Sequence, residues 1–197
     1  NIEKYSIIRS WTAVDRADVC IIMIDANEGV TEQDTKIAGY AHEQGKASII
    51  AVNKWDTVKK ETGTLEEYRK KVLQNLEFMS YAPVVFVSAK TGQRIDRLLE
   101  LIDYVNDQAS LRVQTGLLND VLNEAIAMVQ PPSDKGKRLK IYYMTQVGIK
   151  PPSFVIFVND AELMHFSYLR YLQNTLRNNF GFEGTPIHFT IKEKGDE

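Results

Sequence analysis

The sequence has little cysteine and no long apolar run. Cys20 is the one cysteine among 197 residues and lies inside an apolar stretch, so an intrachain disulfide is excluded and a small buried apolar side chain is expected. No apolar run approaches the ~20 residues that a membrane-spanning helix needs, and no signal-peptide pattern opens the chain. We therefore expect a cytoplasmic protein with no membrane span.

An excess of charge of one sign is also lacking. The 24 Lys and Arg residues and 26 Asp and Glu residues give a net charge of −2, so bulk charge does not predict nucleic-acid binding. Any RNA contact must come from local patches. His42, His165 and His188 are scattered without metal-ligand spacing, so we expect surface or packing roles for them and no metal site.

One apolar stretch ends in a polar motif that suits base recognition. Residues 47–52 are mostly apolar and rich in β-branched side chains, which predicts a strand buried on both faces of a parallel sheet. The strand runs into Asn53-Lys54-Trp55-Asp56, at the end where open α/β sheets bind ligands. The Asp56 carboxylate can accept two parallel hydrogen bonds, from the ring N–H and the exocyclic amine of guanine. Adenine lacks this pair of donors, so the motif predicts guanine recognition.

The other positions of this motif have roles of their own. The stem of Lys54 can lie flat along the base, and the amide of Asn53 can tie the loop to neighbouring backbone. Trp55 is expected to pack. About thirty residues on, Pro83–Val87 predicts a second strand, which ends in Ser88-Ala89-Lys90. In guanine sites such a loop brings a backbone N–H to the guanine carbonyl, with Ser and Lys supporting the pocket.

Helical and extended patterns alternate through residues 1–112. Thr31 with Asp34 predicts a helix start and Gly45 predicts the C-cap of that helix, while Thr64 with Glu67 predicts a capping box. The expected helices cover residues 4–16, 31–44, 64–79 and 95–109, and the expected strands cover 19–25, 47–53 and 84–88. This order predicts an α/β fold with a parallel sheet and flanking helices.

The pattern changes near residue 112, where we place a domain boundary. After it we expect a helix over 115–129, a polar loop over 133–137, strands over 139–147 and 154–158, a helix that Asn159 and Asp160 cap, and a strand over 185–192. The order α-β-β-α-β predicts a small α+β domain over 113–197.

Two features of the second domain leave alternatives open. Gly181 and Gly184 have the GxxG spacing of an RNA-clamping loop, but they join a helix to a strand rather than two helices, so Gly181 is interpreted as a helix C-cap. A set of basic and aromatic positions forms either an RNA- or domain-docking face or an ordinary solvated face: Arg138, Lys140, Tyr142, Lys150, Arg170 and Arg177.

Several longer runs make the chain resemble the double-Era (Der/EngA) family of GTPases. Besides the two polar motifs, the resemblance rests on Glu32-Gln33-Asp34, Ala38-Gly39-Tyr40-Ala41-His42-Glu43, Ser110-Leu111-Arg112-Val113-Gln114-Thr115, Lys150-Pro151-Pro152-Ser153-Phe154 and Gly181-Phe182-Glu183-Gly184-Thr185-Pro186. It implies the later part of a P-loop-type G domain over 1–112 and a KH-like domain over 113–197.

The resemblance also implies a function. It implies a cytoplasmic bacterial GTPase that binds GTP and GDP with Mg²⁺, converts GTP to GDP and phosphate, and assists assembly of the large ribosomal subunit. Implied partners are rRNA, ribosomal proteins and the preceding G domains of the same protein. Guanine binding carries over to Asn53, Lys54, Asp56, Ser88, Ala89 and Lys90.

The departures from the family pattern limit what this chain is expected to do alone. The sequence contains no GxxxxGK(S/T) phosphate loop and no Asp-x-x-Gly motif for magnesium, so no catalytic residue can be assigned and we expect the chain to be inactive alone. The alternative is a non-catalytic ribosome- or protein-docking module with a vestigial guanine site. Without a phosphate-loop strand beside it, the strand 19–25 is expected to form an exposed apolar edge.

Overall fold

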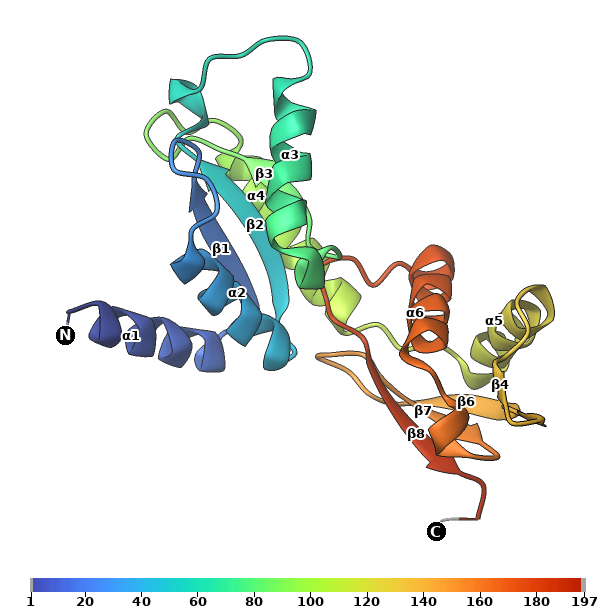
Figure 1. Ribbon diagram of the computed structural model, residues 1–197. Helices are drawn as coiled ribbons and strands as arrows, with labels where there is room; N and C mark the ends of the chain where they lie inside the picture. The colour runs from blue at the N-terminus through green and yellow to red at the C-terminus, as the bar shows by residue number, and fades with distance from the viewer. Residues whose placement is uncertain (1, 196–197) are drawn as a thin grey trace. The chain divides into compact units, whose positions relative to one another are not determined.

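We describe residues 2–195 of the chain from a computed structural model; Asn1, Asp196 and Glu197 lie outside the described residues. The chain divides into two compact units, which are described separately (Figure 1). Unit 1 comprises Asn1–Ala109 and Glu183–Pro186, and unit 2 comprises Ser110–Phe182 and Ile187–Glu197. Among the described residues, no helix is long and apolar enough to cross a membrane.

Unit 1 is built on a parallel sheet, as its apolar strands predict. The strands β1 (Val19–Asp25), β2 (Ala47–Asn53) and β3 (Val84–Phe86) lie in the order β1-β2-β3. In the register of β1 and β2, Asp25 lies beside Asn53, so their carboxyl ends coincide. All but the last residue of β2 is buried, because helices cover both of its faces.

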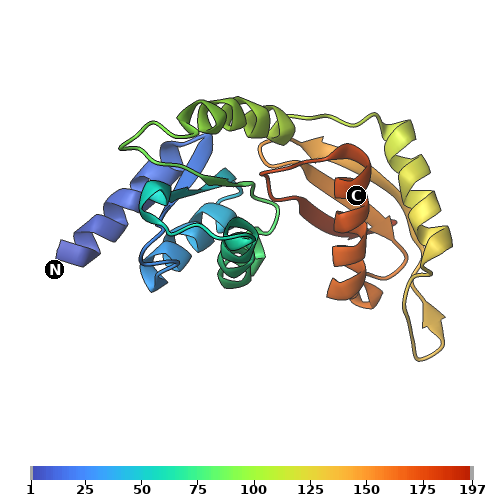
Figure 2. The same cartoon turned by 90° about the horizontal axis from the view of Figure 1, so that it is seen from above.

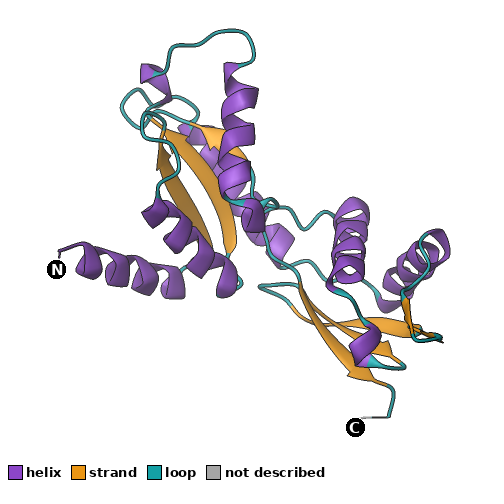
Figure 3. Cartoon of the chain, in the orientation of Figure 1, coloured by secondary structure: helices purple, strands orange, loops and turns teal. Residues whose placement is uncertain are grey.

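Four helices flank this sheet: α1 (Ile2–Arg16), α2 (Glu32–Glu43), α3 (Thr64–Asn75) and α4 (Ile95–Ala109) (Figure 3). Side chains of α1, α2 and α3 share one core cluster with Ile50 and Val52 of β2, whereas α4 shares another with Ile49 and Ala51. Alternate residues of one strand therefore supply both cores. Two short 3-10 turns, η1 (Trp55–Thr57) and η2 (Glu77–Met79), follow β2 and α3.

The helix-start prediction was right for α2 and wrong for α3. Thr31 caps α2 in a reciprocal capping box with Asp34. The C-cap is Gln44 rather than the predicted Gly45, which follows it at φ +71° and turns the chain out of the helix. Thr64 instead lies inside α3, and Gly63 is the N-cap at φ +89°. The Thr64 hydroxyl accepts the backbone N–H of Glu61 at 2.9 Å, so it is not available to cap.

The two edges of the sheet differ in their protection. At the β3 edge, Arg69 and Arg94 donate to the backbone carbonyls of Val84 and Phe86 at 3.0 and 3.2 Å, which occupies groups that another strand could pair with. At the β1 edge, Ile21 and Met23 are 37% and 48% exposed. A cavity of about 390 Å³ opens beside them, between β1, α1 and α2.

We expect this β1 edge to make the chain prone to association. Met23→Lys places a charge on the edge and should reduce both apolar-dye fluorescence and aggregation on heating, with a change in unfolding free energy of about 0.5 kcal/mol or less. Leu99→Lys is the matched control, since Leu99 is exposed on α4. Equal effects of the two substitutions, or a parent chain that binds no dye, would show that the β1 edge is not the cause.

Unit 2 has a second sheet and its own core. The strands β6 (Ile141–Gly148), β7 (Ser153–Val158) and β8 (His188–Glu193) lie in that order, with β6 antiparallel and β8 parallel to β7. The helices α5 (Thr115–Met128) and α6 (Phe166–Phe180) lie on one face of this sheet (Figure 2). Their core includes Leu118, Leu122, Met144, Phe154, Ile156, Leu172 and Leu176. This is the predicted α-β-β-α-β domain.

Local details of unit 2 depart from the sequence prediction. The expected polar loop forms a small hairpin of β4 (Ser133–Asp134) and β5 (Lys137–Arg138), with Lys135 and Gly136 at positive φ in its turn. Asp160 caps the 3-10 turn η3 (Ala161–Leu163), by accepting the N–H of Glu162, rather than α6. Gly181 is the C-cap of α6, as predicted, and its N–H donates to Arg177 O.

Candidate functional site

The two polar motifs meet at the carboxyl end of the unit 1 sheet. The Asn53 side-chain oxygen accepts the backbone N–H of Ala89 at 3.0 Å, and the Asn53 backbone carbonyl accepts the N–H of Ala26 at 2.9 Å. The N–H of Trp55 donates to the carbonyl of Val87 at 3.1 Å. Asn53 thus ties together three loops that follow three neighbouring strands, which is the tethering role the sequence suggests for it.

Trp55 anchors the first motif to the core. Its side chain is 2% exposed and packs against Phe86, with ring centroids 4.5 Å apart, and edge-on against Tyr68 at 5.5 Å. Lys54, the residue before it, has a left-handed backbone at φ +62°. The tight turn lets Trp55 point into the core while Lys54 and Asp56 stay exposed.

The groups that face solvent at this edge are of the type that guanine needs. Asp56 is exposed, and its carboxylate has no hydrogen bond or ion pair with the residues that the structure describes. In the second motif Ala89 and Lys90 are exposed. Because the N–H of Ala89 is taken by Asn53, the N–H of Lys90 is the one in this pair left without a partner inside the described chain. An acceptor and a donor thus face solvent.

Ser88 fixes the conformation of the second loop through its hydrogen bonds. It is fully buried, and its hydroxyl accepts the backbone N–H of Thr91 at 3.1 Å. Its backbone N–H donates to Gln93 O and its carbonyl accepts from Gly92, whose φ of +80° closes the turn. Ser88 therefore fixes the loop that carries Ala89 and Lys90, without itself reaching the surface.

Sequence reasoning assigned no role to Asp25, which the structure places in this site. The Lys54 ammonium donates to the Asp25 carboxylate at 2.5 Å. The hydrogen bond from Lys54 and then that from the backbone N–H of Asn27 hold the pKa of Asp25 below its ordinary value. The same pair raises the pKa of Lys54. Asp25 could have been found from sequence, because it is the last residue of the strand predicted next to the one that ends at Asn53.

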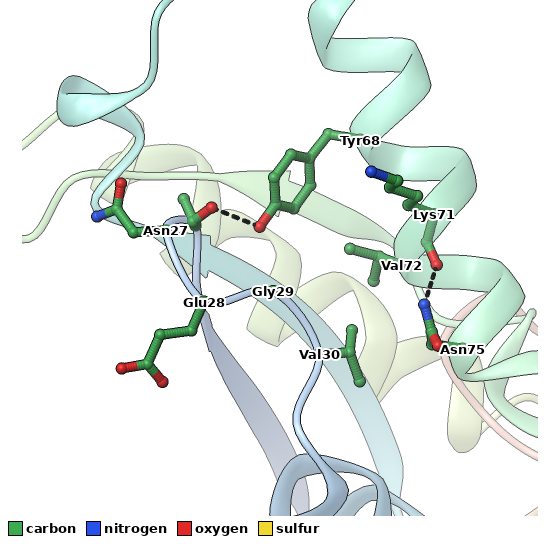
Figure 4. Close-up of a pocket in the computed structure, with 9 residues that line it drawn as sticks. Asn27, Glu28, Gly29, Val30, Tyr68, Lys71, Val72 and Asn75 are labelled. Atoms are coloured by element: carbon green, nitrogen blue, oxygen red, sulfur yellow. Dashed lines mark hydrogen bonds between the residues drawn. The ribbon is translucent and has the colours of Figure 1, made fainter.

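A separate cavity lies between the loop after β1 and the helix α3. It has a volume of about 420 Å³ and is lined by residues of that loop and of α3, among them Asn27, Tyr68, Lys71 and Asn75 (Figure 4). The Tyr68 hydroxyl donates to the carbonyl of Ala26 at 2.7 Å and ties α3 to the loop. None of the six predicted site residues lines this cavity.

The described residues at this edge supply no magnesium site. Within residues 2–195, no group of three His, Cys, Asp or Glu side chains could hold a metal ion. The Asp25 carboxylate at this edge is already paired with the Lys54 ammonium. Magnesium therefore enters no step derived from these side chains.

Comparison with known proteins identifies the chain. Residues 112–192 match the KH-domain-like family of EngA bacterial GTPase enzymes, C-terminal, and residues 6–107 match the Elongation factor Tu GTP binding domain. The GTPase Der of Ruminiclostridium cellulolyticum is 72% identical over the whole chain, and that of Acetivibrio thermocellus is 73% identical. The chain belongs to the Der/EngA family. It spans 45% and 44% of the length of those two relatives.

Solved structures similar to the chain include one of Era. A crystal structure of Era in complex with MgGDPNP and a segment of 16S ribosomal RNA covers 93% of this Der/EngA chain and 67% of its own, at 18% identity and a TM-score of 0.42.

Proposed function

We propose that this chain provides guanine recognition to a bacterial GTPase that assists assembly of the large ribosomal subunit in the cytoplasm. The observation that carries the proposal is the exposed Asp56 carboxylate, unbonded among the described residues, beside loops that Asn53 holds together. A carboxylate held there matches the two adjacent donors of guanine. Membership of the Der/EngA family supports the wider role, hydrolysis of GTP to GDP and phosphate.

Each residue of the site has a proposed part in binding. Asp56 accepts the ring N–H and exocyclic amine, and the stem of Lys54 lies along the base. Asn53 and Ser88 hold the two loops, and the second loop offers the N–H of Lys90 to the guanine carbonyl. Bound nucleotide supplies the phosphoanhydride bond that is cleaved, and Mg²⁺ is expected with it. None of the residues above touches that bond, so no catalytic residue is assigned.

The two units take different parts in this proposal. We assign residues 1–112 to the C-terminal part of a G domain and 113–197 to a KH-like domain; Asn1, Asp196 and Glu197 lie outside the described residues. The proposed partners are guanine nucleotide, the preceding G domains of the same protein, and the rRNA and proteins of the large ribosomal subunit. Matches of separate family models to residues 6–107 and 112–192 support the division.

The proposal is tested with a polypeptide of the relatives' full length that carries this sequence. We expect it to hydrolyse GTP but not ATP, and to co-sediment with the large ribosomal subunit. Hydrolysis without ribosome association would reject the assembly role alone. Ribosome association without guanine binding would favour a non-catalytic docking module instead.

We expect Asp25 to act through Lys54. Asp25→Asn removes the charge that positions the Lys54 ammonium, so GDP should bind about 2- to 5-fold more weakly, the range of an exposed ion pair. Glu32→Gln is the matched control, because it breaks a comparable exposed pair with Lys36 on α2. A fall in GDP affinity of the same size in both variants would contradict a positioning role for Asp25.

The same pair has a defined pH dependence. Because the folded-state pKa of Asp25 is lowered, its contribution to stability is complete above its ordinary pKa and is lost as the pH falls through the lowered value. An NMR titration of the Asp25 carboxyl carbon should therefore show a midpoint below that of an unperturbed Asp. In a chain with Lys54→Met the midpoint should move up, and an unmoved midpoint would mean that Lys54 is not the cause.

A further inference from the structure

The sheet of unit 2 has one covered and one open face. The side chains of Met144, Phe154 and Ile156 point into the core under α5 and α6. By the alternation of a strand, the neighbouring positions point to the opposite face, over which no described helix of unit 2 lies (Figures 1 and 2). These outward positions are Tyr143, Thr145, Val147, Ser153, Val155, Phe157, His188, Thr190 and Lys192, and all of them are at least partly exposed except Val155 on the central strand.

Aromatic side chains gather at one end of this open face. The rings of Tyr143 and Phe157 stack across β6 and β7, with centroids 4.4 Å apart and planes 17° from parallel. Tyr142 lies beside them at a β-bulge between Ile141 and Tyr143. Tyr142 and Tyr143 are 43% and 42% exposed. Packed against each other and still exposed, these rings form a rigid flat surface that no core contact requires.

Positive charge surrounds the aromatic surface. Lys192 lies on β8 at the position beside Phe157, and the Lys194 ammonium lies 5.0 Å from the centre of the Tyr142 ring. Lys140 is exposed immediately before β6. None of these lysines forms an ion pair with another described residue. The nearest carboxylate on β8, Glu193, points to the other side, where it accepts the N–H of Ala161 at 2.9 Å.

We propose that this face, defined by Lys140, Tyr142, Tyr143, Phe157, Lys192 and Lys194, binds single-stranded RNA. Flat exposed rings stack on unpaired bases of any sequence, and lysines without acidic partners attract the phosphate backbone. A protein partner of ordinary charge gains nothing from a basic rim around the rings. The choice of RNA rests on the proposed function, in which the chain contacts the large ribosomal subunit.

The test is fluorescence anisotropy of a labelled single-stranded RNA of about 10 nucleotides, the length that one such surface covers. Tyr143→Ser removes one ring of the stack and should weaken binding about 10-fold. Lys192→Gln with Lys194→Gln should also weaken binding. The plot of log affinity against log salt concentration should become less steep by about 1.4, or about 0.7 for each phosphate that is no longer neutralised. Arg112→Gln with Lys135→Gln removes the same charge elsewhere on unit 2, at two exposed residues outside this face, and should change the affinity little.

The possible results separate this face from the function as a whole. Loss of RNA binding in the sheet variants, with the control retained, supports the face. Equal binding by the sheet variants, loss in the control instead, or preference for single-stranded DNA overturns it. So does binding of a ribosomal protein, rather than RNA, that the sheet variants lose. None of these results bears on the guanine site, because GDP binding is tested separately with variants of Asp56 in unit 1. Circular dichroism of every variant verifies folding.

Discussion

Replacing Asp56 with alanine is expected to weaken GDP binding by about 100-fold or more. The substitution leaves the two donors of the guanine edge without their acceptor, and removing one partner of a charged hydrogen-bonded pair costs about 2–5 kcal/mol. It should not disturb the fold, because the carboxylate is exposed and makes no bond to the described residues. The measurement is calorimetric titration of GDP into a polypeptide of the relatives' full length, where the phosphates are held as well.

A matched pair of variants distinguishes base recognition from a general effect of charge. Asp56→Asn keeps the shape of the side chain but replaces one acceptor with a donor, so GDP should bind weakly and xanthosine diphosphate, with a carbonyl in place of the amine, should bind better. Glu66→Gln removes one negative charge from α3 and should leave both affinities unchanged. Weaker GDP binding in Glu66→Gln, or no gain in affinity for xanthosine diphosphate in Asp56→Asn, would contradict a direct contact between Asp56 and the base.

Replacing Gly184 with alanine is expected to destabilise unit 1 by about 3 kcal/mol. Gly184 belongs to unit 1, where it accepts the N–H of Ser48 at 2.7 Å and donates to Tyr81 O at 2.9 Å. It has a φ of +81°, and a Cβ there would lie 2.4 Å from a methyl group of Val105. A left-handed alanine costs about 1–2 kcal/mol and overpacking a further 1–3 kcal/mol.

Tryptophan fluorescence in urea measures this effect, because the two tryptophans, Trp11 and Trp55, both lie in unit 1. Gly39→Ala is the control: a Cβ there meets nothing within 4 Å, so the variant should be as stable or slightly more stable. Adding Val105→Ala to Gly184→Ala should recover part of the stability if the clash is the cause. Equal unfolding free energies of Gly184→Ala and the parent chain would contradict the close contact between Gly184 and Val105.

Patterns that depend on periodicity were readable from the sequence. The strand ending at Asn53 followed from a continuous apolar run, and the helix at residues 95–109 followed from helical spacing, because burial of apolar side chains decides both. The two polar motifs could be placed at one edge of the sheet, because parallel strands end together. The tie from Asn53 to Ala89 then follows from strands that lie side by side.

Features that depend on particular three-dimensional contacts were not readable. Thr64 matches a capping pattern, but its hydroxyl bonds to Glu61, and nothing in the local sequence separates the two outcomes. The ion pair between Asp25, at the end of β1, and Lys54, just after β2, depends on side-chain geometry, although the position of both residues at one edge of the sheet could be predicted. Gly184 resembles part of an RNA-binding loop, and its packing against Val105 needs the fold to be known. Such contacts join residues far apart in sequence, which local propensity does not encode.

The most direct test of a guanine site at this edge is an NMR titration of the chain itself with guanosine and adenosine monophosphates. The backbone amides of Asp56, Ala89 and Lys90 belong to the two loops that face the proposed base position. We expect guanosine monophosphate to shift these amides at concentrations of about 1 mM, and adenosine monophosphate to leave them in place. Equal shifts with both nucleotides, or none with guanosine monophosphate in a folded chain, would contradict guanine recognition here.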